Sequence, residues 1–308
     1  MNRSLAHFVA FAVILNFGSL LNSVRGDDSD RPIIVCSTTQ VADFARQVVG
    51  DDWEVRCLLA PGQDPHLYRV TPNDAKLVAD ATLCLSNGLN LEGNNWMGAL
   101  AQDAGKPLVQ CTEGIRLLKV PDDEGDEGSE VADPHAWFSP QNAAVYVRNI
   151  LRGVKAIDPE GSDRYDSRAA LYLSQLRGLD AWIKSQCNTI PRDRRILVTS
   201  HDAFGYFCSD YGFRSAAPAG WSTGQEIGAG ITPARRKAAV DSIREFGVKA
   251  IFVETSVNPK LIREIASEAG VKIGGELYSD SMGQSGTAGE SYLGMMRENV
   301  LTLVNALR

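Results

Sequence analysis

The segment EGSDRYDSRAALYLSQLRGLDAWIKSQC, residues 160–187, determines how the rest of the sequence is organised. Its apolar side chains recur at spacings of three and four residues, which is the pattern of a single amphipathic helix. They are Tyr165, Ala169, Tyr172, Leu176, Leu179 and Ile183. Such a helix would be on the order of 40 Å long, so it can run beside two domains. Gly178 is its weak point, worth about 1 kcal/mol relative to alanine.

On both sides of this segment, short apolar runs alternate with helical patterns. N-terminal to it, we expect strands at 32–36, 53–59, 81–86 and 107–111, with helices at 39–49, 72–80 and 91–103. C-terminal to it, we expect strands at 195–199, 249–254 and 271–274, with helices at 202–211, 233–246, 259–269 and 290–307. Alternation of this kind is typical of α/β folds with mostly parallel sheets.

Capping residues occur at the predicted N-termini of several of these helices. A capping oxygen precedes proline at Thr71-Pro72, Ser139-Pro140, Thr232-Pro233 and Asn258-Pro259. We therefore predict an N-terminal βα lobe at 27–158, a linking helix at 159–188 and a C-terminal βα lobe at 189–308. Two such lobes leave a cleft between them, where ligands commonly bind.

The first 26 residues differ in kind from the remainder. Arg3 precedes a run from Phe8 to Leu21 that is mostly apolar but too short and interrupted to span a bilayer comfortably. Small residues near Gly26 suit a cleavage site, so we predict a secretory signal peptide at 1–26 and a periplasmic or otherwise extracytoplasmic protein. An uncleaved anchor is the alternative. No cysteine lies at the cleavage point, and lipidation is therefore not indicated.

The net charge of -7 argues against nucleic acid as the main partner. Acidic residues concentrate at 121–130, where a polar surface loop is expected. Six cysteines in an exported chain raise the question of disulfides. Cys187 and Cys208 flank a predicted strand and could pair. The others fall in apolar runs and are interpreted as small buried hydrophobic residues: Cys36, Cys57, Cys84 and Cys111.

Only three histidines follow the predicted signal peptide, and each occupies a loop near a strand end. His66 and His135 both follow Asp-Pro, whereas His201 follows the strand at 195–199. Proline stiffens the backbone before the first two rings, which limits the entropy lost on metal binding. Asp64 and Asp133 either orient these imidazoles or cap their own turns.

Three imidazoles suit zinc, copper, nickel or iron, and a tetrahedral site requires one more ligand. Asp280 follows the strand at 271–274 and is the best candidate for it, although the sequence contains 38 acidic residues. A zinc-dependent hydrolase with water as the fourth ligand is the alternative. The adjacent Ser200-His201-Asp202 cannot adopt the geometry of a catalytic triad, and no phosphate-binding glycine motif is present.

Several sequence motifs, and the order in which they occur, resemble those of the zinc- and manganese-binding solute-binding proteins of ABC importers, the TroA-like group. The likeness runs from about residue 32 to the C-terminus. The motifs are PGQDPH (61–66), NGLNLE (87–92), DPHAW (133–137), TSHDAFGY (199–206), IFVE (251–254) and GELYSD (275–280).

The resemblance implies a bilobed receptor, not an enzyme, with one metal ion between the lobes. It places the ligands at His66, His135, His201 and Asp280, and it implies delivery to a membrane permease with its cytoplasmic ATPase. Manganese receptors of the group usually carry glutamate at the third position, so three nitrogens and one oxygen favour Zn²⁺. The segment 277–280 is closer to the manganese-associated members, so dual Zn²⁺/Mn²⁺ or Mn²⁺ binding is the alternative. We expect a monomer.

Overall fold

A computed structural model of the chain describes residues 31–121, 129–216 and 232–308. Residues Pro32–Arg308 form one compact unit, and the following description concerns that unit. The predicted signal peptide and most of the acidic segment 121–130 lie outside the described residues. Within the described part of the chain, no helix is long and apolar enough to cross a membrane.

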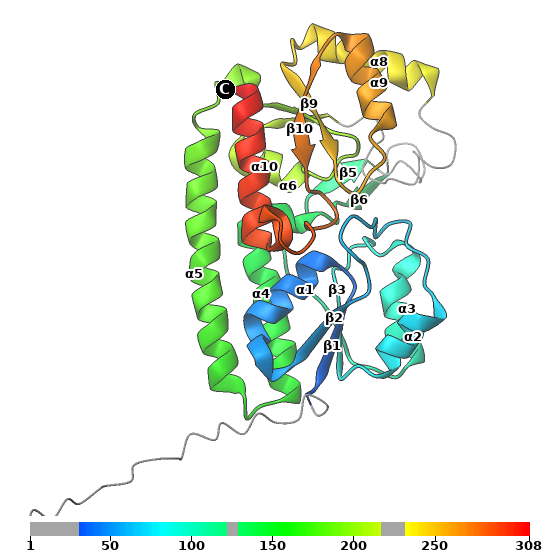
Figure 1. Cartoon of the computed structure of the whole chain (residues 1–308), viewed down its shortest axis with the longest axis vertical. Coiled ribbons are helices and arrows are strands. Elements are labelled where there is room, and N and C mark those ends of the chain that lie inside the picture. Colours follow the sequence, from blue (N-terminus) through cyan, green and yellow to red (C-terminus); the bar gives the residue numbers. More distant parts are fainter. Residues whose placement is uncertain (1–30, 122–128, 217–231) are drawn as a thin grey trace, which may run out of the picture. The chain divides into compact units, whose positions relative to one another are not determined.

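The N-terminal half is built on a four-stranded parallel sheet with strand order β2-β1-β3-β4 (Figure 1). Its strands are β1 Ile33–Cys36, β2 Glu54–Cys57, β3 Leu83–Ser86 and β4 Leu108–Gln110. Its helices are α1 Thr39–Val49, α2 Pro72–Ala79, α3 Trp96–Asp103 and α4 Pro140–Ile157. Alternate residues of β1 point to opposite faces, so Ile34 packs in the cluster with α1 and α4, and Val35 packs in the cluster with α2 and α3.

The C-terminal half contains two parallel strand pairs, β7 with β8 and β9 with β10. Its strands are β7 Ile196–Val198, β8 Arg214–Ala216, β9 Ala250–Glu254 and β10 Lys272–Leu277. Its helices are α6 Gly205–Tyr211, α8 Pro233–Glu245, α9 Lys260–Ala269 and α10 Tyr292–Leu307. A short antiparallel pair precedes α4 in the sequence: β5 Lys119–Pro121 and β6 Glu130–Ala132.

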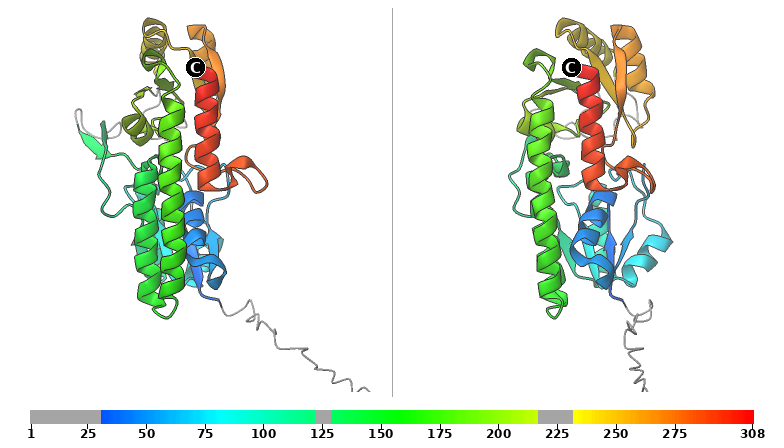
Figure 2. Two further views of the ribbon diagram at one scale, coloured as in Figure 1. Left: turned by 90° about the vertical axis from the view of Figure 1, so that its left-hand side faces the viewer. Right: turned by 60° about the vertical axis from the view of Figure 1, so that its left-hand side comes forward.

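The long helix α5, Ser162–Cys187, links the two halves and packs against α1, α4 and α10 (Figures 1 and 2). Phe44 of α1 lies at the centre of this packing. Its ring centroid is 5.5 Å from that of Tyr146, 6.3 Å from that of Tyr172 and 4.8 Å from that of Tyr292. Because these rings come from α4, α5 and α10, elements of both predicted lobes share the largest hydrophobic cluster.

The predicted α/β architecture with a long linking helix is confirmed. Thr71 and Ser139 cap α2 and α4 as expected, each accepting a hydrogen bond from a backbone N–H. The helix predicted from residue 91 begins only at Trp96, because Asn94 and Asn95 adopt left-handed backbone angles before it. The pair β5–β6 and strand β8 were not predicted, since three-residue strands leave little periodicity to detect. All six cysteines are free thiols in the structure.

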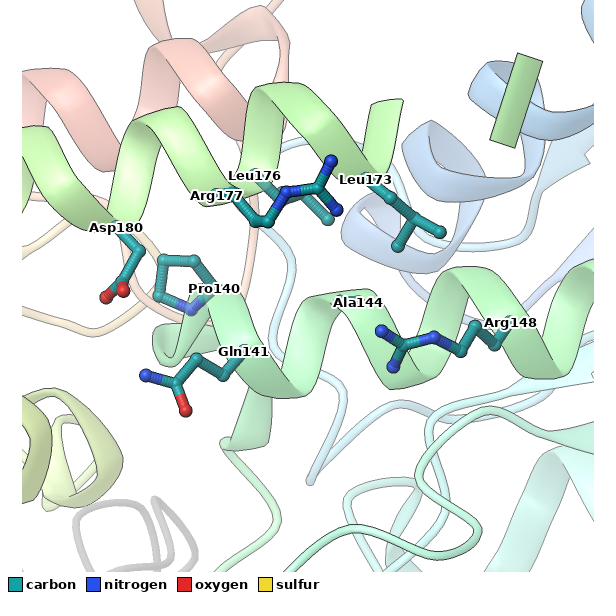
Figure 3. Close-up of a pocket in the computed structure, with 8 residues that line it drawn as sticks. All are labelled: Pro140, Gln141, Ala144, Arg148, Leu173, Leu176, Arg177 and Asp180. Carbon is teal, nitrogen blue, oxygen red and sulfur yellow. The ribbon is translucent and has the colours of Figure 1, made fainter. Parts of the chain in front are cut away.

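A shallow groove of about 170 Å³ separates α4 from α5 (Figure 3). Its floor is partly apolar, and two arginines and one aspartate lie at its edges. The lining residues are Pro140, Gln141, Ala144, Arg148, Leu173, Leu176, Arg177 and Asp180. None of the candidate ligands is among them, so this groove is separate from the site described below.

Gly178 offers a direct test of the linking helix. No atom lies within 4 Å of a Cβ built at this position, so alanine fits without a clash. We expect Gly178→Ala to raise the free energy of unfolding by about 0.5–1 kcal/mol, because alanine restricts the unfolded chain more than glycine does. Urea denaturation measures this difference.

Gly161→Ala at the start of the same helix is the matched control. Its Cβ would lie 2.4 Å from the Tyr165 ring, so this change should destabilise the protein. Loss of stability in Gly178→Ala would show that α5 is not a regular helix at this point.

Candidate metal centre

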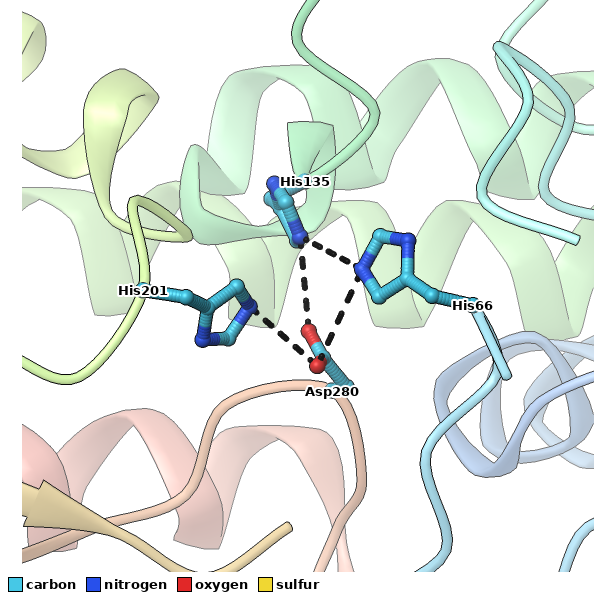
Figure 4. A group of neighbouring side chains, drawn as sticks. All are labelled: His66, His135, His201 and Asp280. Atoms are coloured by element: carbon cyan, nitrogen blue, oxygen red, sulfur yellow. Dashed lines mark hydrogen bonds and ion pairs between the residues drawn. The ribbon is translucent and has the colours of Figure 1, made fainter. Parts of the chain in front are cut away.

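Four side chains that are distant in the sequence meet in the interior of the Pro32–Arg308 unit (Figure 4). They are His66, His135, His201 and Asp280, and one ligand atom from each lies within 4.8 Å of all the others. Figure 4 shows the three rings arranged around the carboxylate, with one nitrogen of each directed inward.

The carboxylate of Asp280 is the common neighbour of the three imidazoles. Its Oδ2 lies 3.2 Å from Nε2 of His201 and 3.9 Å from Nε2 of His66. Its Oδ1 lies 3.5 Å from Nε2 of His135, and the Nε2 atoms of His66 and His135 are 3.2 Å apart. Neither oxygen of Asp280 accepts a well-aligned hydrogen bond from the described residues. Polar atoms buried in this way require a partner, and a cation among the three nitrogens would supply one.

The loop that carries His66 is fixed by neighbouring backbone and side-chain groups. Trp96 Nε1 donates a hydrogen bond to the carbonyl oxygen of Pro65, at 3.1 Å. A Cβ at Gly93 would lie 2.4 Å from the carbonyl oxygen of His66, so only glycine permits this approach. Asp64 Oδ1 accepts a hydrogen bond from the His66 backbone N–H at 2.8 Å, the local turn expected from Asp-Pro-His.

His135 is held through both its ring and its backbone. Oδ1 of Asp133 lies 2.8 Å from Nδ1 of His135 and also accepts a hydrogen bond from its backbone N–H. Both expected roles of Asp133, orienting the ring and capping the turn, are therefore present. Asn87 Nδ2 donates a hydrogen bond to the carbonyl oxygen of Pro134 at 3.0 Å, which fixes the preceding peptide. With Nδ1 engaged, Nε2 is the nitrogen that faces Asp280.

His201 has a corresponding carboxylate partner in Glu254, at the end of β9. Oε2 of Glu254 lies 2.7 Å from Nδ1 of His201, and Oε1 accepts a hydrogen bond from the His201 backbone N–H at 3.0 Å. All of these groups are buried. The arrangement directs Nε2 of His201 toward Asp280, as Asp133 does for His135.

Charge in this site is uneven before any metal binds. Burial lowers the pKa of His66 to about 3, so its ring is neutral at physiological pH. Burial acts in the same direction on His201, but Glu254 and Asp280 raise the pKa of that ring well above its usual value. Burial would raise the pKa of Asp280, yet the histidines, His201 foremost, hold it below its usual range. His201 therefore faces an acidic side chain at each ring nitrogen, Glu254 at Nδ1 and Asp280 at Nε2.

Comparison with known proteins identifies the family. The family described as ZnuA, zinc-uptake complex component A, periplasmic, matches residues 34–306. The chain belongs to this family. Proteins of the ZnuA family are the substrate-binding components of metal ABC transporters, and they are not enzymes. They work outside the cytoplasm with a membrane permease and an ATPase. The hydrolase alternative is therefore set aside.

Two relatives that match nearly the whole chain are described as manganese proteins. The manganese-binding lipoprotein MntA of Bacillus subtilis (strain 168) is 36% identical over 317 residues, covering 100% of each chain. The manganese ABC transporter substrate-binding lipoprotein PsaA of Streptococcus pneumoniae is 31% identical over 315 residues, covering 99% of each chain. Both are described as lipoproteins, which does not support the expected absence of lipid.

Solved structures of similar fold are described with zinc in one case and manganese in another. The periplasmic zinc binding protein TroA from Treponema pallidum superposes with a TM-score of 0.82 at 31% identity, covering 90% of this chain and 99% of that chain. A Mn-bound periplasmic metal binding protein from candidatus liberibacter asiaticus gives a TM-score of 0.78 at 27% identity, covering 90% and 100%.

Sequence reasoning found the four side chains at the centre of this site but assigned no role to Glu254. The residue lay within the family motif IFVE, at the end of a predicted strand next to that of His201. The signal available in the sequence was an acidic residue at the end of an apolar strand. Its contact with Nδ1 of His201 arises because strands β7 and β9 lie next to each other, and the sequence does not specify that arrangement.

Acid should destabilise the metal-free protein through His66. Its pKa in the folded state, about 3, is below its ordinary value, so between these values the unfolded chain binds a proton that the folded chain does not. Lowering the pH from about 6.5 to about 4.5 should therefore reduce the free energy of unfolding by about 2 kcal/mol through this group. His201, whose pKa is raised, keeps its full contribution below pH 6.5 and loses it only as the pH rises.

Urea denaturation of metal-free His66→Gln at both pH values isolates this contribution. The variant should lose less stability than the wild type on acidification. An equal loss in the two proteins would mean that His66 is already solvated in the folded state.

Proposed function

We propose that His66, His135, His201 and Asp280 bind one divalent transition-metal ion per chain as transported cargo. The observation that supports this proposal is the convergence of three Nε2 atoms on a buried carboxylate whose oxygens lack well-aligned hydrogen bonds. Three nitrogens and one or two carboxylate oxygens suit a divalent first-row ion. Asp133 and Glu254 hold two of the rings in the required tautomer.

We further propose that manganese is the delivered ion and that zinc binds to the same atoms. The sequence expectation placed zinc first because nitrogen ligands predominate. Full-length relatives described as manganese receptors support manganese instead. The two expectations are compatible, because zinc binds more tightly than manganese to almost any nitrogen and oxygen site. Manganese delivery then requires that available manganese greatly exceed available zinc.

The proposed cycle consists of capture outside the cytoplasm and delivery to a permease. The ligands come from segments on both sides of the linking helix at 159–188. A bound ion would therefore connect the lobe at 27–158 to the lobe at 189–308. We propose that a monomer, cleaved after residue 26, performs this cycle. Excess metal at roughly 1,000 times the dissociation constant would stabilise the folded state by about 4 kcal/mol.

We also propose that Cys36 carries no lipid, in contrast to the lipoprotein relatives. It is the first cysteine of the sequence, and its side chain is fully buried in β1, paired in register with Cys57. An acyl chain on this sulfur would require the strand to leave the core.

Metal loading tests the identity of the cargo. We expect metal-free protein, given manganese alone, to bind about one ion per chain, as measured by elemental analysis. Zinc added at equal concentration should displace most of this manganese, because of its higher affinity for nitrogen ligands. Absence of stoichiometric manganese binding would contradict a manganese receptor and leave zinc, whereas absence of both ions would contradict the proposed site.

Replacement of the carboxylate tests the role of Asp280. We expect Asp280→Ala to weaken metal binding by at least about 100-fold, since it removes a carboxylate that lies within 3.9 Å of the Nε2 atom of each ring. Calorimetric titration measures the change. Glu276→Ala removes an exposed carboxylate from strand β10 and serves as the control, with unchanged affinity expected. Equal affinities for the two variants would exclude Asp280 as a ligand.

A further inference from the structure

The loop between β10 and α10 carries Asp280 (Figure 4), and hydrogen bonds anchor it on both sides. On the side of its own half, Ser256 Oγ lies 2.7 Å from Ser279 Oγ, and the Asp280 backbone N–H donates to Ser256 Oγ at 3.4 Å. Asn299 of α10 clamps Tyr278, donating to its carbonyl oxygen and accepting from its N–H. These contacts leave the other side of the loop to be held by the N-terminal half.

The first turn of α1 supplies that second anchor as a chain of hydrogen bonds. The Met282 backbone N–H donates to Oγ1 of Thr39 at 2.9 Å. Oγ1 of Thr39 donates to Oε1 of Gln40 at 3.1 Å, and Nε2 of Gln40 donates to the carbonyl oxygen of Ser279 at 3.1 Å. Each bond fixes the direction of the next, so the carboxamide of Gln40 has one orientation that satisfies the chain.

This relay holds the loop on both sides of Asp280, since Ser279 precedes the carboxylate by one residue and Met282 follows it by two. Gln40 is only 1% exposed and Thr39 8%. Polar groups at such depth are costly unless they are hydrogen-bonded, and the same low exposure strengthens the bonds that they make. An all-apolar contact would bury the loop equally well but would not determine where the Asp280 backbone lies.

We propose that Thr39 and Gln40 are positioning residues that set the rate at which the metal leaves. Their hydrogen bonds run to each other and to the backbone of the loop that carries Asp280. They fix the loop that presents Asp280 to His66 and His135, which belong to the same half of the chain as α1. Loss of the relay leaves the hydrogen bond from the Gly62 N–H to Ser281 Oγ in place but removes the other two from the N-terminal half, so the carboxylate moves away with its own half more easily and the ion dissociates faster. The proposal rests on the metal-binding function proposed above.

A cavity of about 520 Å³ beside the relay makes this proposal testable by mutation. Its lining includes Thr39 from α1 and Met282, Gly283 and Ser285 from the loop. Water in this space can solvate the Met282 N–H when its partner is removed, so a variant without the relay should still fold. The anchors at Ser256 and Asn299 remain in such a variant.

The experiment compares two substitutions at one position. Thr39→Val keeps the shape of the side chain and removes the hydroxyl, whereas Thr39→Ser keeps the hydroxyl. Protein loaded with manganese, and separately with zinc, is mixed with excess chelator, and the dissociation rate is followed by stopped flow. We expect Thr39→Val to release metal about 10-fold faster, and Thr39→Ser to stay within about 2-fold of the wild type. Association rates should change little, because the ligands themselves are intact.

Gln40→Met provides an independent variant of similar volume and completes a double-mutant cycle. If the relay acts as a unit, the double variant Thr39→Val/Gln40→Met should release metal about as fast as either single variant. Unchanged release rates in both single variants would overturn the proposal, as would multiplied effects in the double variant.

Two outcomes distinguish failure of this inference from failure of the proposed metal-binding function. Normal release from Thr39→Val, with one ion bound per wild-type chain, would refute the positioning role and leave the metal receptor intact. Absence of metal from the wild type would refute the receptor itself. A fall in the unfolding free energy of metal-free Thr39→Val without faster release would mean that Thr39 has only a structural role, which also overturns the proposal.

Discussion

The buried carboxylate of Asp280 is the group on which the rest of the site depends. A charge in the protein interior is strongly unfavourable unless other groups compensate it. Here the compensation comes from the three imidazoles, among which His201 lies between Glu254 at Nδ1 and Asp280 at Nε2. A divalent ion at the Nε2 atoms would compensate the same carboxylate. The architecture around them can be understood as the means of bringing these side chains to one point.

Parallel strands provide the positions, and a shared hydrophobic core provides the rigidity. His201 follows β7 and Asp280 follows β10, so both lie beyond the carboxyl ends of their strands. The aromatic cluster around Phe44 joins α1, α4, α5 and α10 into one packed body. Helix α1 thus has two functions: its middle contributes to the core, and its first turn contacts the Asp280 loop.

Much of this could be predicted from local patterns, and the exceptions have a common cause. Helix α1 and the capped start of α2 follow from periodicity and from Thr71-Pro72, which act over a few residues. The candidate ligands were found because histidine is rare in this chain, but Asp280 required the family motif, since acids are abundant. Glu254 and Gln40 could not be assigned, because each acts through a contact more than 50 residues distant in sequence. Such contacts depend on how strands and loops assemble, which periodicity does not encode.

The distribution of the four candidate ligands from position 66 to position 280 also bears on when the proposed metal site can form. A chain that is still unfolded during export has single histidines and scattered acids, none of which competes well for an ion. Only completion of both halves, including the final loop before α10, brings the four candidate ligands together. Under the proposed assignment, the chain therefore binds metal only after it has folded. A fragment cut between the ligand-bearing loops would lack part of the ligand set.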